Sequence, residues 1–295
     1  MTMEKSIEKP IFLVGTGRSG TTLSHRVLSQ HPEIAWLSAL LNKFPNRPQH
    51  NRRLLQLLDR PIVGAWIQER LPLGDGECYP FWSRYYPGFS RPIRDLVAED
   101  VTERTRLKIG SLMEQMLTPK RRRLLVKITG WPRLGFLQAI FPDARFLHIV
   151  RDGRAVANSL LNVDFWEGWR GPSNWRWGKL SHEYEEIWQR YDQSFVALAA
   201  INWELLTIEM DQARQLIPSE QFFEFRYEDL CDDPNTTLRN MIDFCELEWS
   251  DEFEHAIKRH AFKNTNHKWR KDLTANQQQI LNEILTKRLK YYNYV

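Results

Sequence analysis

The sequence predicts an α/β fold built on a mainly parallel β-sheet, and two observations carry this prediction. Apolar runs of strand length lie at residues 11–14, 124–128, 144–150 and 221–227. The first run is apolar at every position, as in strands that are buried on both faces of a parallel sheet. Helical patterns at 22–30, 132–141 and 153–161 alternate with these runs, which is the order of successive β-α-β units.

Further helices are expected at 102–117, 183–209, 211–216 and 234–245. Residues 42–100 depart from this pattern because they are rich in proline, glycine and aromatic residues, with one short helix expected at 54–58. Such a segment is typical of a loop-rich functional insertion. With 295 residues and 42 % hydrophobic content, residues 1–295 are predicted to form a single domain that carries this insertion.

The charge and cysteine content exclude several classes of protein. The 41 basic and 37 acidic residues leave a net charge of +4, which gives no support to a nucleic-acid partner. The basic run 120–123 is interpreted as a solvated loop. The three cysteines have no CxxC spacing, so neither a zinc site nor a disulfide framework is indicated. We find no signal-type segment and no apolar stretch of ~18 residues, and we expect a soluble, cytoplasmic protein without a membrane span.

A glycine-rich loop follows the first predicted strand and precedes a helix. It runs through Gly15, Thr16, Gly17, Arg18, Ser19, Gly20, Thr21 and Thr22. Backbone N–H groups in such a loop converge on an anion at the helix N-terminus. Phosphate loops of triphosphate enzymes carry a lysine where this chain has Thr21, so a magnesium-dependent nucleotide enzyme is disfavoured. Arg18 instead places a planar cation inside the loop, where it can hold a phosphate or sulfonate.

A second candidate anion site begins at the end of the predicted strand 144–150. Arg151 follows that strand, at the sheet edge where α/β proteins bind their ligands. Ser159 lies about two helical turns further on and can return a hydroxyl to the same side. Arginine at a strand end is also a common ion-pair residue, so this motif alone leaves both interpretations open.

Taken together, the segments 18–22 and 151–159 resemble the two cofactor-binding motifs of the 3′-phosphoadenosine-5′-phosphosulfate (PAPS)-dependent sulfotransferase superfamily, in its soluble bacterial form. The segment 226–234, with Tyr227, is similar to the family's strand-end Tyr-Glu-Asp-Leu segment. The segment 268–274 is similar to the C-terminal stretch that closes over the nucleotide. The resemblance covers residues 11–40 and 124–285 and leaves the middle of the chain unassigned.

The resemblance implies a P-loop-like, three-layer α/β fold with a five-stranded sheet, PAPS as sulfuryl donor, 3′-phosphoadenosine 5′-phosphate (PAP) as product, and no catalytic metal. The loop residues Gly17 to Thr22 would hold the 5′-phosphosulfate, and Arg151 with Ser159 the 3′-phosphate. Tyr227 would lie near the adenine, and the lid would be formed by Lys268, Trp269 and Arg270. Lys127 resembles a lysine placed near the transferring group, although a surface lysine is an equal alternative.

The general base is not evident from the resemblance. Residues 36–42 contain no acidic side chain where many relatives have a glutamate, and Thr129 stands where cytosolic relatives carry a histidine. Glu77 is the first candidate because a carboxylate amid glycines and aromatics can be desolvated, with His50 second and Asp75 third. For each, a solvated loop residue is the alternative. An aromatic group either lines the acceptor pocket or forms a structural cluster: Phe165, Trp166, Trp169, Trp175 and Trp177.

Two other functions remain open from the sequence. One is a kinase-type nucleotide-binding protein, which shares the strand–loop–helix unit, and the other is an inactive binder of PAPS or PAP. The acceptor would be a small molecule, a glycan or a lipid, and the sequence does not distinguish them. A homodimer is compatible with the tyrosine-rich C-terminus but is not indicated by it.

Overall fold

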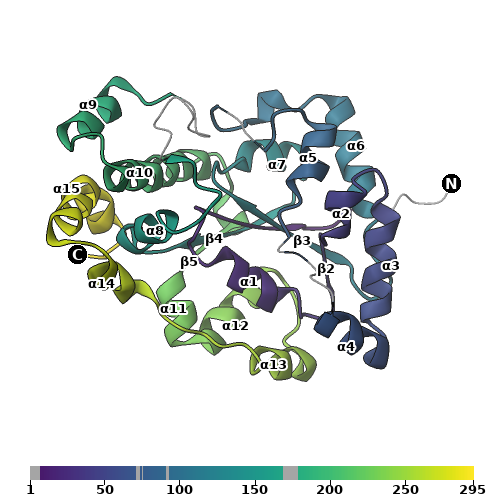
Figure 1. The fold of residues 1–295 in the computed structure, drawn as a ribbon. Coiled ribbons are helices and arrows are strands. Elements are labelled where there is room, and N and C mark those ends of the chain that lie inside the picture. The colour runs from purple at the N-terminus through teal and green to yellow at the C-terminus, as the bar shows by residue number, and fades with distance from the viewer. Residues whose placement is uncertain (1–6, 71–73, 75, 91–92, 169–178) are drawn as a thin grey trace.

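The computed structural model describes residues 7–70, 74, 76–90, 93–168 and 179–295. Five parallel strands form one sheet in the order β2-β3-β1-β4-β5 (Figure 1). The strands are β1 (Ile11–Gly15), β2 (Ile34–Trp36), β3 (Arg123–Thr129), β4 (Arg145–Val150) and β5 (Phe222–Arg226). The expected α/β class and five-stranded sheet are confirmed, and the sheet is parallel throughout rather than mainly so.

The register of the sheet brings the carboxyl ends of its central strands to one edge. Gly15 at the end of β1 pairs with Thr129 of β3 on one side and with Ile149 of β4 on the other. From β1 the chain first builds the β2–β3 side and then crosses to β4 and β5. The order therefore reverses between β1 and β4, and the crevice at such a switch point is where open α/β sheets bind ligands.

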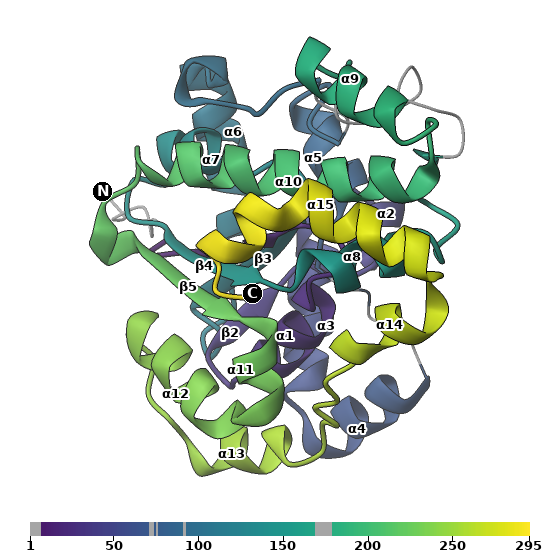
Figure 2. The ribbon, with the colours of Figure 1, turned by 90° about the vertical axis from the view of Figure 1, so that its left-hand side faces the viewer.

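Helices cover both faces of the sheet, which gives three layers (Figures 1 and 2). One face carries α1 (Thr21–Leu28), α11 (Tyr227–Asp232), α12 (Pro234–Phe244) and α13 (Asp251–Ile257). The other carries α6 (Glu103–Glu114), α7 (Leu134–Ile140) and α10 (Phe195–Arg214). A second apolar core forms where α10 packs against α8 (Gly153–Leu160) and α15 (Ala275–Tyr291), with the short α14 (Trp269–Asp272) beside them.

Helices were expected at 183–209 and 211–216, and this division is wrong. Two helices occupy this region, α9 (His182–Arg190) and α10, and the chain reverses between them. Asp192 and Gln193 lie in the left-handed region with φ of 52° and 55°, so a continuous helix cannot pass through them. Ser194 then caps α10 by accepting a hydrogen bond from the Ala197 N–H. Residues 211–216 are not a separate helix, since α10 continues to Arg214.

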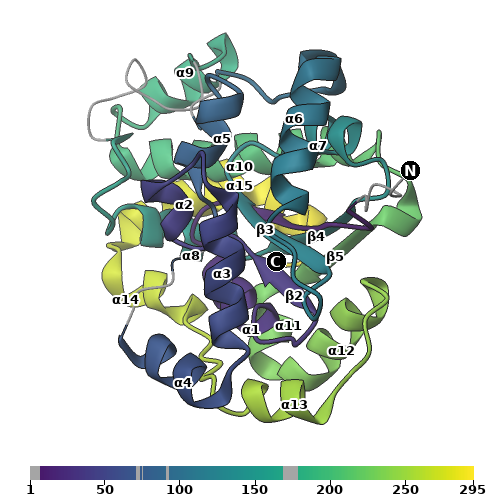
Figure 3. The same cartoon turned by 90° about the vertical axis from the view of Figure 1, so that its right-hand side faces the viewer.

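The segment 42–100 is helical where loops were expected. After α2 (Leu40–Lys43) it contains α3 (Pro48–Leu58), α4 (Pro61–Arg70), α5 (Tyr79–Tyr85) and the 3₁₀ turn η1 (Ala98–Asp100), and Figure 3 shows α3 and α4 along one side of the molecule. Prolines 48, 61 and 80 suggested breaks, but each lies in the first turn of a helix. Proline is favoured there because its missing N–H has no intrahelical partner.

The interpretation of the basic run 120–123 as a solvated loop holds for Lys120 and Arg122, which are exposed, but not for the other two residues. Arg121 is buried and pairs with Asp59 over 2.9 Å, while its Nη1 donates to the Ile34 carbonyl oxygen over 2.7 Å. The arginine thereby ties α3 to the three-residue strand β2, which was too short to be predicted. Arg123 belongs to β3 and donates to the Lys9 carbonyl oxygen.

Candidate functional site

The glycine-rich loop joins β1 to α1 through two residues with left-handed backbone conformations. Arg18 has a φ of 70°, and Gly20, the N-cap of α1, has a φ of 99°. A Cβ atom on Gly20 would lie 2.5 Å from the Tyr227 ring, so glycine is required for this packing. The hydroxyls of Thr16 and Ser19 are hydrogen-bonded inside the loop. The loop therefore turns tightly over the helix N-terminus, where an anion is favoured.

Arg151 leaves the end of β4 and reaches this loop. Its Nη1 donates to the Arg18 carbonyl oxygen over 2.8 Å, and its guanidinium lies 4.3 Å from the centre of the Tyr227 ring. Its other nitrogens donate to Asn266 and Thr265 over 2.8 and 3.0 Å. Burial lowers the pKa of Arg151 below its usual range, because removal from water disfavours the charged form. A bound anion would offset that cost.

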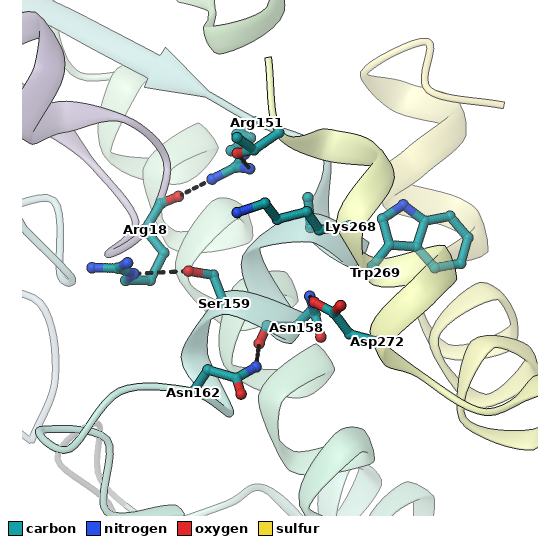
Figure 4. A pocket seen from close by; sticks show the side chains of 10 residues that line it. Arg18, Arg151, Asn158, Ser159, Asn162, Lys268, Trp269 and Asp272 are labelled. Carbon is teal, nitrogen blue, oxygen red and sulfur yellow. Dashed lines mark hydrogen bonds between the residues drawn. The ribbon is translucent and has the colours of Figure 1, made fainter. Parts of the chain in front are cut away.

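A pocket of about 260 Å³ opens between the loop, α8 and the C-terminal segment (Figure 4). Across it, Arg18 Nε donates to Ser159 Oγ over 2.9 Å. Lys268, from the 3₁₀ turn η5 (Asn266–Lys268), extends toward the two arginines. Three cationic side chains from separate segments thus converge on one cavity. The lining residues are Arg18, Arg151, Ala155, Asn158, Ser159, Asn162, Thr265, Lys268, Trp269 and Asp272.

The two other residues of the predicted lid differ in position. Trp269 contributes to the pocket wall but is only 4 % exposed, and its ring packs against the Arg154 guanidinium at 4.8 Å in the second core. Arg270 lies on the same ring at 4.9 Å, is exposed, and does not line the pocket. Trp269 therefore fastens the segment to α8, while Lys268 is the residue that faces the cavity.

A second cluster lies at the end of β3, beside the start of α1. Lys127 is only 1 % exposed, and its Nζ donates to Thr22 Oγ1 over 3.0 Å. The same nitrogen is 3.5 Å from Glu77 Oε1, which also accepts a hydrogen bond of 2.8 Å from Thr129 Oγ1. Lys127 is thus no surface lysine, and a carboxylate stands next to it.

Glu77 is positioned by the residues around it. Gly76 has a φ of 84°, and a Cβ atom there would lie 2.2 Å from Nε2 of the buried His25 ring on α1. Two residues after Glu77, the Tyr79 hydroxyl donates to the Thr129 carbonyl oxygen over 2.9 Å. Burial, and then the charge of Glu77, raises the pKa of Tyr79, so the phenol keeps its proton and remains a donor. The loop is therefore fixed on both sides of the carboxylate.

The family model described as "Sulfotransferase family" matches residues 10–251, which include all five strands. The chain belongs to the sulfotransferase family. The omega-hydroxy-beta-dihydromenaquinone-9 sulfotransferase Stf3 of Mycobacterium bovis is 24 % identical to it over 315 residues, which cover 97 % of this chain and 76 % of the relative. The protein is therefore a transferase, as its motifs predicted.

Solved structures agree with this assignment at the level of the fold. Sulfotransferase STF9 from Mycobacterium avium is 19 % identical, with a TM-score of 0.58 over 97 % of this chain and 77 % of that one. The sulfotransferase domain from the curacin biosynthetic pathway is 16 % identical, with a TM-score of 0.53 over 95 % of this chain and 98 % of that one. At these identities the likeness shows the shared α/β fold, which confirms the fold class that the sequence predicts.

The other described base candidate of the sulfotransferase, His50, is not in the cluster around Lys127. His50 lies in α3 with its ring 5.3 Å from that of Phe44, and no hydrogen bond joins it to Lys127 or Glu77 in the described part of the chain. Asp75 lies outside the described residues. Of the two candidates whose positions are described, the fold brings only Glu77 to Lys127.

The aromatic group at 165–177 is described only at its first two members. Phe165 is 51 % exposed, and Trp166 is half-buried against the second core. The other members, Trp169, Trp175 and Trp177, lie outside the described residues. Whether the group lines an acceptor pocket therefore stays a prediction.

Several polar residues of the sulfotransferase pocket were missed in the sequence. Asn158 donates to Asp272 over 2.8 Å, and Asn162 donates to the Asn158 carbonyl oxygen over 2.8 Å, so both amides belong to the pocket wall. Asn158 precedes Ser159 on α8, and Asn162 lies in the turn just after the helix. Their spacing of four residues was a usable signal, because it places two residues on one side of a helical turn. Thr265 and Asn266, the partners of Arg151, carried no comparable pattern.

The described residues contain no group of three or more His, Cys, Asp or Glu side chains placed to hold a metal ion. Within the same residues, no helix is both long and apolar enough to cross a bilayer.

Proposed function

We propose that this sulfotransferase moves a sulfuryl group from PAPS to a hydroxyl or amine of its acceptor and releases PAP. The single observation that carries the proposal is the convergence of Arg18, Arg151 and Lys268 on one pocket, next to a glycine-rich loop at a helix N-terminus. A donor with a phosphate on one side of its ribose and a phosphosulfate on the other needs two separated anion sites. The pocket would take the 3′-phosphate, and the loop the 5′-phosphosulfate.

Tyr227 extends this site toward the adenine of the donor. Its ring packs between the backbone of Gly20 and the Arg151 guanidinium, and its hydroxyl donates to the Lys263 carbonyl oxygen over 2.7 Å. A ring held on three sides is a rigid apolar surface beside both anion sites. We assign the adenine environment to it.

Lys127 and Glu77 would carry out the chemistry at the far end of the loop. In an in-line displacement the acceptor oxygen or nitrogen forms a bond to sulfur while the bond from sulfur to the bridging oxygen breaks. Lys127, with the loop N–H groups and Arg18, would stabilise the negative charge that develops on the bridging oxygen. Glu77 would accept the proton of the acceptor, because among the described residues it is the base candidate that lies beside Lys127.

The acceptor would enter from the side built by residues 42–100, which supply Glu77. The relative Stf3 is named for a hydroxylated menaquinone derivative. A lipid with a free hydroxyl is therefore the first acceptor class to test, ahead of glycans and other small molecules.

Calorimetry followed by sulfate transfer tests the proposal. We expect PAP to bind equally well with and without Mg²⁺, and ATP to bind more weakly, because ATP lacks the 3′-phosphate that the pocket would hold. Radiolabelled PAPS should then transfer its label to one acceptor class. Tighter binding of ATP that requires Mg²⁺ would favour the kinase-type alternative. Binding of PAP without transfer to any acceptor class would favour the inactive binder.

A further inference from the structure

Helices α3 and α4 carry a group of exposed apolar side chains that no described residue covers. Ile62 is 86 % exposed and Trp66 51 %, and their spacing of four residues places them on one face of α4. Leu57, near the end of α3, and Val63 are each 38 % exposed. We call these four residues the α3–α4 patch; the two helices are in contact, and Figure 3 shows α4 at the lower end of α3.

Positive charge is concentrated on these two helices and on the residues that flank them. Between residues 43 and 70 the chain has six basic and two acidic residues, an excess that equals the net charge of the whole protein. One of the two acids, Asp59, is already paired with Arg121. Four exposed arginines form no ion pair with any described residue: Arg52, Arg53, Arg60 and Arg70.

Arg70 also shows how charge and apolar surface are combined. Its guanidinium lies 5.0 Å from the centre of the Trp66 ring, so its stem and the indole form one amphipathic unit. Tryptophan and arginine together are suited to the boundary between lipid headgroups and acyl chains.

We propose that the α3–α4 patch docks this protein on an anionic lipid surface. Ile62, Trp66 and their neighbours would enter the boundary between headgroups and acyl chains, and Arg52, Arg53, Arg60 and Arg70 would contact lipid phosphates. Neither feature is sufficient alone, because interfacial binding combines buried apolar area with attraction to anionic headgroups. The inference depends on this surface and not on the identity of the donor or acceptor.

A second copy of the chain fits the patch less well. In a two-fold dimer the same patch meets itself, which would set the arginines of one copy against those of the other. Nucleic acid is also a poor partner, because phosphate contacts give no reason to expose Ile62 almost completely. An anionic lipid surface offers acyl chains to the α3–α4 patch and phosphates to the arginines around it.

The patch is close in sequence to the proposed reaction site. Arg70 ends α4, and Gly74 follows four residues later, where its backbone packs against Ala39. Four residues span at most about 14 Å, so the docked helix lies within one short connection of the loop that carries Glu77. A protein docked in this way would hold its acceptor side close to the lipid.

Flotation of the full chain with lipid vesicles tests the proposal. We expect binding to phosphatidylcholine vesicles in which about a third of the lipid is phosphatidylglycerol, weak binding to pure phosphatidylcholine, and loss of binding as NaCl approaches ~1 M. The double substitution Ile62→Ser with Trp66→Ser should lower the partition coefficient about tenfold or more. Arg53→Gln and Arg60→Gln should each lower it about fivefold.

The matched controls lie on α6, where Leu107 is 57 % exposed and Arg104 is exposed. Leu107→Ser and Arg104→Gln should leave vesicle binding unchanged, and thermal unfolding of every variant should match the parent. Equal binding to neutral vesicles, absence of binding, or an equal loss in the controls would overturn the proposal. So would light scattering that shows a dimer which Ile62→Ser dissociates, since the patch would then join two copies.

Discussion

The proposed donor side and the proposed acceptor side of this sulfotransferase are built in different ways. On the donor side, Arg18 and Arg151 follow closely on the ends of β1 and β4, and hydrogen bonds hold both side chains. Arg151, for example, has all three of its nitrogens hydrogen-bonded to the loop after β1 or to the C-terminal segment. On the acceptor side, the region of α2 to α5 contacts Lys127 through Glu77, in the loop before α5.

This difference separates two tasks of a transferase, which are to bind the donor nucleotide and to position the acceptor for reaction. In the proposed donor site, strand ends and hydrogen bonds such as those of Arg151 determine the geometry. The acceptor site can change with the helices that surround it, while the glycine at residue 76 and the tyrosine at residue 79 keep the carboxylate in place. Substitutions on the two sides should therefore have separable effects on nucleotide affinity and on turnover.

The largest effect is expected at Glu77. Glu77→Gln keeps the size of the side chain and removes its ability to take a proton, so turnover should fall about 10²–10⁴-fold. Affinity for PAP, measured by calorimetry, should stay within about twofold of the parent. Glu99→Gln, an exposed glutamate of η1, is the matched control and should behave as the parent. Unchanged turnover in Glu77→Gln would remove this residue from the reaction.

Arg151→Gln should instead affect the proposed donor side. It removes a buried cation and leaves the Arg18 carbonyl oxygen with a weaker donor, so PAP should bind about 30–100-fold more weakly. Arg145→Gln is the control, because Arg145 begins β4 at the opposite edge of the sheet. It should leave PAP affinity unchanged. If both variants lost affinity to the same degree, the effect would come from the strand and not from the pocket.

The local structure around the proposed donor side could be predicted from the sequence because its signals are local. A buried strand, a glycine-rich turn and a helix follow one another within residues 11–28, and Arg151 follows directly on a strand. The contact between Arg18 and Ser159 joins residues 141 positions apart, yet parallel strand pairing brings their two motifs to one edge. The family model and the fold confirm the class that these motifs indicate.

The acceptor side could not be predicted in the same way. Three of its prolines, at positions 48, 61 and 80, occupy first turns of helices, a position that composition alone does not reveal. The strand β2 has only three residues and depends on Arg121, whose burial follows from tertiary contacts. The pairing of Glu77 with Lys127 likewise depends on a loop that packs on His25. Each of these features results from packing between segments distant in sequence, which overrides local propensity.

Gly76→Ala tests whether the loop that carries Glu77 packs against His25 on α1 as described. The new Cβ atom would collide with the His25 ring and would occupy a left-handed backbone position, so we expect a loss of about 2–3 kcal/mol in unfolding free energy. Turnover should fall by roughly tenfold as Glu77 is displaced, with PAP affinity retained. Gly88→Ala is the control, because Gly88 has a φ of 91° with no atom within 4 Å of its Cβ position. It should lose less stability and no activity; equal effects in both variants would contradict the contact.

The smallest effect is expected at Glu204, in the second core behind the donor pocket. Burial on α10 raises its pKa to about 7, while Arg288 acts in the opposite direction. An unfolded glutamate ionises near pH ~4.3, so the folded protein holds a proton that the unfolded chain releases, and stability is lost as pH rises toward 7.

Glu204→Gln should remove that loss and make the protein more stable than the parent at neutral pH, by on the order of 1–2 kcal/mol, with no difference near pH ~4. Denaturant unfolding across this pH range measures the change, and the exposed Glu248→Gln should leave the profile unaltered. PAP affinity should not change in either variant, because Glu204 does not line the pocket. A parallel loss of PAP affinity in Glu204→Gln would mean that the second core, and not only the strand ends, determines the geometry of the donor site.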